Sequence, residues 1–268
     1  MSQYKIEAGT GQHIGDRDEQ QDRTALLTAP KAPGYLLAVV ADGMGGRSGG
    51  TLAAEQVIHT ARQAFERFSP LTDTPETILQ AIAHEADTVI RLSALSSEKQ
   101  PHSTVVLLLV TPQGQAIWGH AGDSRLYHFS GPNCTTRTRD HTYQAHLAAQ
   151  HPDGKAPAVA PEQAHMLVNF LGGKPLAPGL TIDRREALQA GDAFLLCTDG
   201  LWQYFKEAEL GAAIAAHSPR KACEMLIDKA RMRANGSRAD NCTLAIIKFS
   251  RPDPTVREYT AKTMRRAV

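Results

Sequence analysis

Short apolar runs that stop at acidic turns constrain this chain more than any other feature of its sequence. Residues 35–41 (YLLAVVA) stop at Asp42-Gly43, and residues 194–197 (FLLC) stop just before Asp199-Gly200. Runs of this length and composition, bounded by turn-forming residues, are typical of strands buried on both faces. Three more such runs lie at residues 104–110, 115–119 and 243–249. A Pro-Gln-Gly turn joins the first two of these three, which predicts a hairpin.

Helices are expected in two places between or after these strands. Apolar residues recur at helical spacing over 57–68 and 78–90, and Thr74-Pro75 supplies an N-cap and a first-turn proline for the second helix. A third helix begins at Ser218-Pro219 and ends at Asn235-Gly236. Strands, a helix pair, more strands and further helices predict an α+β fold in which antiparallel sheets are covered by helices.

Composition excludes several classes of protein. The 268 residues carry 29 Lys and Arg against 28 Asp and Glu, so the net charge of +1 argues against a nucleic-acid binder. No apolar run approaches the length of about 18 residues that spans a membrane, and the N-terminal residues lack a signal-peptide pattern. Four cysteines without a CxxC pair indicate a reducing compartment, so a cytoplasmic protein is expected. We expect one domain at 1–249 and a basic C-terminal tail at 250–268.

Four aspartates occupy comparable positions next to these strands. Asp42 and Asp199 each follow an apolar strand and precede a glycine, Asp240 stands just before the last strand, and Asp123 follows the run at 115–119. A single Asp-Gly pair is most often a turn. Several carboxylates gathered at one edge of a sheet repel one another, and they stay ionised together only if cations bind among them. Oxygen ligands without paired Cys or an HExxH motif favour Mg²⁺ or Mn²⁺ over zinc.

Six motifs follow one another along the chain in a defined order. They are RDEQQD (17–22), VVADGMGG (39–46), GHAGDSRLY (119–127), DHT (140–142), LLCTDGLW (195–202) and ADNCTLAII (239–247). In this series they resemble the PP2C-type (PPM) metal-dependent serine/threonine protein phosphatases over about residues 8–249. Met44, after Asp42-Gly43, resembles the bacterial type. The resemblance implies a four-layer αββα sandwich, in which two antiparallel β-sheets are flanked by helix pairs.

The resemblance also implies a metal centre that holds two or three Mn²⁺ or Mg²⁺ ions at one end of the sandwich. Asp42 would bridge two ions, the Gly43 carbonyl would bind one of them, and Asp199 and Asp240 would bind the other. Asp123 matches the position that, together with Asp199, holds a third metal ion in bacterial members. Asp42 and Asp199 would thus be catalytic as well as metal-binding.

Further residues of the same motifs have implied roles outside direct metal binding. Arg17 matches the catalytic arginine that grips the substrate phosphate, and Asp22 closes that motif. Gln21 stands where the family commonly has an acidic residue, so it can approach a metal ion only through its carbonyl or a water. Asn241, beside Asp240, either holds the ligand in place or forms a turn.

The implied activity is hydrolysis of phosphomonoesters on phosphorylated Ser/Thr proteins by a metal-activated water, in opposition to a bacterial Ser/Thr kinase. No nucleic-acid or membrane partner is expected. One alternative is a non-catalytic member that binds phosphoproteins, although such a protein would be expected to have lost its metal-binding aspartates. The other alternative is a metal-dependent hydrolase of small phosphate compounds. The segment 145–165 lies where the family has a variable flap near the site, and it does not indicate a substrate.

Overall fold

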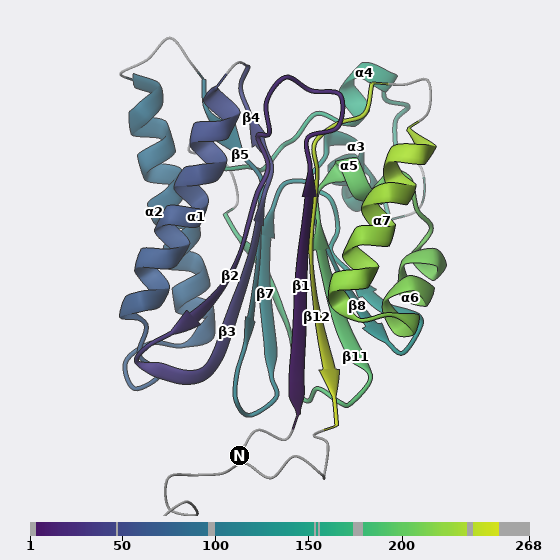
Figure 1. The fold of residues 1–268 in the computed structure, drawn as a ribbon. Coiled ribbons are helices and arrows are strands. Elements are labelled where there is room, and N and C mark those ends of the chain that lie inside the picture. The colour runs from purple at the N-terminus through teal and green to yellow at the C-terminus, as the bar shows by residue number, and fades with distance from the viewer. Residues whose placement is uncertain are drawn as a thin grey trace, which may run out of the picture.

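Two five-stranded antiparallel sheets pack against each other at the centre of the computed structural model (Figure 1). The structure describes residues 4–46, 48–95, 100–152, 154, 156–173, 179–234 and 238–251. The first sheet has the order β1 (Lys5–His13), β12 (Cys242–Ser250), β11 (Asp192–Cys197), β8 (Arg125–Ser130) and β9 (Asn133–Arg137). The second has the order β10 (Thr181–Arg185), β7 (Ala116–Ala121), β6 (Val105–Val110), β3 (Ala32–Ala41) and β2 (Arg23–Ala29). A short pair, β4 (Gly43–Met44) and β5 (His102–Ser103), extends beyond β3.

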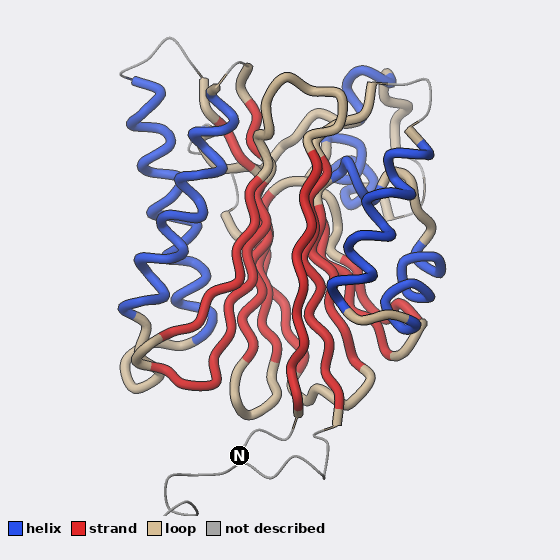
Figure 2. The backbone as a smooth tube through the Cα atoms, viewed as in Figure 1, coloured by secondary structure: helices blue, strands red, loops and turns tan. Residues whose placement is uncertain are grey.

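Helices cover the outer face of each sheet (Figure 2). The pair α1 (Gly49–Arg67) and α2 (Pro75–Leu95) packs on the second sheet, and α6 (Glu207–Ala216) with α7 (Pro219–Arg233) packs on the first. Three shorter helices are α3 (Tyr143–Gln150), α4 (Pro161–Ala164) and α5 (Asp199–Trp202). The predicted four-layer αββα sandwich is therefore confirmed.

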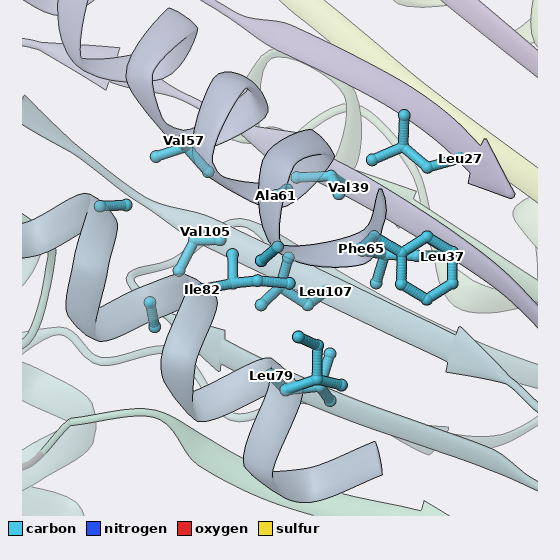
Figure 3. Close-up of a cluster of buried hydrophobic side chains, with 14 of the residues drawn as sticks. Leu27, Leu37, Val39, Val57, Ala61, Phe65, Leu79, Ile82, Val105 and Leu107 are labelled. Atoms are coloured by element: carbon cyan, nitrogen blue, oxygen red, sulfur yellow. The ribbon is translucent and has the colours of Figure 1, made fainter. Parts of the chain in front are cut away.

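The apolar runs of the sequence are continuous because their strands are buried on both faces. In β3, Leu37 and Val39 pack among residues of α1 and α2, including Phe65 and Leu79 (Figure 3). The alternate residues of the same strand, such as Val40, face the layer between the two sheets. Successive side chains of a strand point to opposite faces, so each residue of such a run finds apolar neighbours.

The helix boundaries follow the capping residues. Thr77 donates its backbone N–H to Thr74 Oγ1 (3.2 Å) at the start of α2, and Lys221 donates its N–H to Ser218 Oγ (3.4 Å) at the start of α7. Helix α7 ends at Arg233, and the predicted stop at Asn235-Gly236 lies outside the described residues. The predicted hairpin joins β6 to β7.

The far end of the chain is described only as far as residue 251. Strand β12 ends at Ser250, which falls at the predicted boundary between the domain and the basic tail. Residues 252–268 lie outside the description, so the division at 249/250 stays a prediction. Within the described ranges no helix is long and apolar enough to cross a bilayer.

Candidate metal centre

The four strand-end aspartates meet at the end of the sandwich that carries β4, β5 and α5, uppermost in Figure 1. Asp42 follows β3, Asp123 follows β7, Asp199 opens α5, and Asp240 precedes β12. They line one cavity of about 700 Å³. Its lining consists of Arg17, Asp18, Glu19, Gln21, Asp42, Gly43, Met44, Gly45, Gly46, Asp123, His165, Leu167, Asp199, Arg238, Asp240 and Asn241. The structure therefore brings together the aspartates that the sequence singled out.

The backbone at Asp42-Gly43 is fixed by hydrogen bonds to Thr104 and by close packing against α1. The Asp42 N–H donates to Thr104 Oγ1 (3.0 Å), and the Thr104 N–H donates to the Asp42 carbonyl (2.9 Å). A Cβ on Gly43 would lie 2.0 Å from the carbonyl oxygen of Gly50 in the first turn of α1. Only glycine allows this approach, so the position of the Gly43 backbone is set by the packing of α1.

Asp22 lies beneath the cavity and supports the Asp199 loop. Its side chain is buried, and Thr198 Oγ1 donates to Asp22 Oδ2 (2.9 Å). Thr198 directly precedes the short helix α5, whose first residue is Asp199. Burial raises the pKa of Asp22 to about 7. Asp22 is therefore a buried anchor of the site rather than part of its lining.

The carboxyl groups of the cavity disfavour one another's charged forms. Burial, followed by the nearby charges of Asp123 and Asp240, raises the pKa of Asp199 to about 7. The pKa of Asp42 is raised well above its ordinary value, first by burial and then by the charges of Asp22 and Asp199. The pKa of Asp123 is also raised, mainly by burial. Clustered carboxyl groups of this kind either hold protons or hold cations.

Arg17 supplies one counter-charge at the rim. Its Nη2 lies 2.5 Å from Asp240 Oδ2, and its side chain keeps 46% of its surface exposed. An ion pair with this much exposure contributes little to stability. The guanidinium at the mouth of the cavity can therefore leave Asp240 at little cost in free energy.

The side chain of Asn241 makes hydrogen bonds to the loop that carries Arg17. Its Oδ1 accepts the N–H of Gln21 (2.7 Å), and its Nδ2 donates to the carbonyls of Ile14 (2.8 Å) and Glu19 (3.0 Å). Gln21 in turn donates from Nε2 to the carbonyl of Gly46 (3.0 Å). The side-chain amide of Asn241 thus joins separate loops, while its backbone N–H donates to Asp240 Oδ1 (2.8 Å), so both roles that the sequence left open stay possible.

A network of contacts around Asp123 was not predicted from the sequence as part of the site. Trp202 Nε1 donates to the Asp123 carbonyl (3.0 Å), and the Arg125 guanidinium lies 3.4 Å from the centre of the Trp202 ring. Arg125 also binds both carboxylate oxygens of Asp140, at 2.7 and 2.6 Å. Arg125 thus links Asp140 to the Trp202 ring beside the Asp123 turn. Among the other lining residues, His165, Leu167 and Arg238 had no signal in any motif.

Comparison with known proteins decides the family. The sequence pattern of the family described as protein phosphatase 2C matches residues 9–234. The chain belongs to the protein phosphatase 2C family. This confirms the predicted family and, with it, the predicted enzyme class of protein serine/threonine phosphatase.

Named relatives in this protein phosphatase 2C family come from several bacteria. The serine/threonine phosphatase stp of Listeria innocua is 26% identical over 79% of this chain and 84% of its own length. The protein phosphatase PhpP of Streptococcus pneumoniae is 26% identical over 82% of this chain and 88% of its own length. The serine/threonine protein phosphatase PstP of Mycobacterium tuberculosis is 27% identical over 80% of this chain but only 40% of its own length.

Solved structures of several bacterial proteins share the fold. The S. agalactiae serine/threonine phosphatase superposes with a TM-score of 0.78 at 22% identity, over 91% of this chain and 99% of that one. PppA of Pseudomonas aeruginosa, described as a regulatory component of T6SS, has a TM-score of 0.72 at 28% identity, over 91% and 97%. The PstP catalytic domain, solved with two manganese ions, has a TM-score of 0.74 at 23% identity, over 91% and 98%.

Proposed function

We propose that this protein is a Mn²⁺- or Mg²⁺-dependent phosphatase that removes phosphate from phosphoserine and phosphothreonine residues of proteins. The observation that carries the proposal is the convergence of Asp42, Asp123, Asp199 and Asp240 on one cavity with an arginine at its mouth. The names of the Listeria and Streptococcus relatives and the manganese ions of the PstP structure support the same reading.

The side chains of the cavity fit hard divalent cations. The donor atoms are carboxylate oxygens and the Gly43 carbonyl. Burial, followed by the neighbouring carboxylates, raises the pKa values of Asp42 and Asp199, and a bound cation would offset both effects. In the described part of the chain, no three His, Cys, Asp or Glu side chains close around one point. Mg²⁺ is commonly held by one or two carboxylates with water completing its shell, so a closed cage is not needed.

In this proposal two ions would be held by Asp42, Gly43, Asp199 and Asp240, and a third would be held by Asp123 together with Asp199. When bound, such ions lower the pKa of a coordinated water and neutralise charge on the phosphate. Side chains of the protein would position the phosphate and the Asp199 loop. Arg17 would orient the phosphate with its planar guanidinium, and Asp22 would keep the Asp199 loop in place through Thr198.

The proposal also includes the cellular role of the protein. We expect the protein to oppose a Ser/Thr kinase in a reducing compartment such as the cytoplasm, and all four of its cysteines are free thiols. The expected absence of nucleic-acid and membrane partners stays a prediction. Hydrolysis of small phosphate compounds uses the same metal chemistry, and it is the second candidate function.

Release of phosphate from a phosphothreonine peptide tests the proposed function. We expect hydrolysis with Mn²⁺, none after chelation, and recovery when Mn²⁺ is restored. A panel of small phosphate esters at matched concentrations serves as the comparison. Efficient cleavage of the small esters without cleavage of any phosphopeptide would favour the second candidate function, and binding of phosphopeptides without turnover would favour a non-catalytic member.

Arg17→Ala is expected to raise the KM for a phosphothreonine peptide by about 10-fold or more, while Mn²⁺ binding is retained. The reason is that the guanidinium contributes a charge-assisted hydrogen bond, worth about 1.5–3 kcal/mol, to the phosphate but no ligand to the metal. Steady-state kinetics and calorimetric Mn²⁺ titration measure the two quantities. Arg238→Ala is the matched control, because Arg238 also lines the cavity. An unchanged KM together with lost Mn²⁺ binding would contradict the assignment.

A further inference from the structure

His141, from the next motif, makes two hydrogen bonds to Gly122 in the turn that carries Asp123. The His141 N–H donates to the Gly122 carbonyl (3.0 Å), and the Gly122 N–H donates to His141 Nδ1 (3.2 Å). Gly122 has φ +112°, and a Cβ there would lie 2.6 Å from Thr104 Cγ2. Both backbone groups of a glycine that no other residue can replace are thus held by one histidine.

The hydrogen bonds of the His141 ring define its neutral form. Nδ1 accepts from Gly122 and also lies 3.2 Å from Asn169 Nδ2, so the ring proton sits on Nε2 and is donated to Thr181 Oγ1 (3.0 Å). Burial, followed by the neighbouring His120, lowers the pKa of His141 to about 4. The ring therefore keeps an acceptor facing Gly122 at neutral pH.

His141 also holds the segment that closes one side of the cavity. The Val168 N–H donates to the His141 carbonyl (2.9 Å), and Asn169 Nδ2 donates to the Gly179 carbonyl (2.7 Å). His165 and Leu167, just before these residues, line the cavity. One residue thus connects the Asp123 turn to the wall formed by residues 165–169.

We propose that His141 is a positioning residue that holds the Asp123 carboxyl group at the cavity, so that cation binding at Asp123 depends on the Nδ1 acceptor of His141. The inference rests on the proposed function, because it concerns the third of its metal positions. The Trp202 bond to the Asp123 carbonyl fixes the other side of the turn but leaves the Gly122 N–H to His141. Among the hydrogen bonds of the described residues, none joins His141 to Asp42 or Asp240, so cation binding at those two residues is expected to be independent of it.

A matched pair of substitutions isolates the acceptor. His141→Asn places an amide oxygen where Nδ1 lies, whereas His141→Leu has a similar shape and no acceptor. His120→Leu is the control, because the His120 ring stacks on His141 (4.4 Å between centroids) without bonding to Gly122. Mg²⁺ titration of the full chain, followed through the backbone amide resonances of Asp123 and Gly43, reports the two regions separately.

His141→Leu is expected to raise the half-saturating Mg²⁺ concentration at Asp123 by about 10-fold and to leave that at Gly43 unchanged. His141→Asn and His120→Leu should both keep the half-saturating Mg²⁺ concentration of the wild type at each resonance. His141→Gln, whose amide reaches toward Nε2 instead, replaces His141→Leu if the latter does not fold.

The proposal would be overturned if the half-saturating Mg²⁺ concentration at the Asp123 resonance were the same in His141→Leu and in the wild type. It would also be overturned if the Asp123 resonance of the wild type did not respond to Mg²⁺. An equal rise at Asp123 and Gly43 would reduce His141 to a general structural role and would also overturn it. The proposed function fails separately, if the wild type neither responds to Mg²⁺ at Gly43 nor hydrolyses phosphothreonine peptide with Mn²⁺.

Discussion

Asp199→Asn is expected to lower Mn²⁺-dependent phosphatase turnover by about 100- to 1,000-fold while the protein stays folded. The substitution keeps the shape of the side chain but removes a charged oxygen from a site that stabilises charge developing on the phosphate. In other enzymes, the loss of one group that stabilises such charge lowers turnover by about 100- to 1,000-fold. The fold should survive, because Asp199 opens the short helix α5 at the cavity rather than packing in an apolar layer. Asp240→Asn should behave in the same way.

Turnover at saturating Mn²⁺ and the melting temperature are the two measurements for these variants. Asp18→Asn is the control, because Asp18 also lines the cavity and is not among the proposed ligands. Wild-type turnover in Asp199→Asn would show that the metal assignment is wrong. A comparable loss in Asp18→Asn would show that the total negative charge of the cavity matters, rather than particular ligands.

Metal-free protein is expected to lose stability as the pH rises from 6.5 to 8, and Mn²⁺ is expected to restore it. The pKa values of Asp22 and Asp199 are about 7 in the folded chain, against about 4 in an unfolded one. Between these values the folded state binds more protons, so the free energy of unfolding falls with increasing pH. The lowered pKa values of buried His120 and His141 act in the opposite direction, but only below about pH 6.5.

Calorimetric melting at pH 6.5 and 8, with chelator or with Mn²⁺, measures this effect. A cation present at about 100 times its Kd raises the free energy of unfolding by about 2.7 kcal/mol. For a chain of this size, that corresponds to a rise in Tm of about 5–10 °C. Asp199→Asn is the control. It should melt higher than the wild type in chelator at pH 8 and gain less from Mn²⁺. A wild-type Tm that rises with pH in chelator would contradict the expected protonation of the cluster.

The sequence predicted those parts of the molecule that have a strong local pattern. The strands before Asp42 and Asp199 are apolar on both faces, which made their ends easy to recognise. Strand β1 (KIEAGTGQH) lies at the edge of its sheet, and its residues are mostly exposed or half-buried. Such a strand has no continuous apolar run, so nothing in the sequence predicted it.

The candidate site was predictable only where a motif named its residues. The aspartates and Arg17 came from motifs, whereas the hydrogen bonds of Trp202 to Asp123 and of His141 to Gly122 join segments separated by 79 and 19 residues. These bonds depend on how β7, α5 and the following loops pack, which no local pattern contains. Arg238 also reaches the cavity through a contact between distant segments. The Ala239 N–H donates to Asp16 Oδ2, which joins the segment of Arg238 to residues 14–22.

The ion pair between Arg17 and Asp240 makes the two halves of the proposed reaction interdependent. The group expected to bind phosphate is paired here with a group expected to bind a cation. A cation at Asp240 would release the guanidinium, so the affinity for phosphate should rise with cation occupancy. Thermodynamic reciprocity then requires phosphate to raise the affinity for the cation by the same factor. Phosphate and the cation should therefore each bind more tightly when the other is present, whichever of the two binds first.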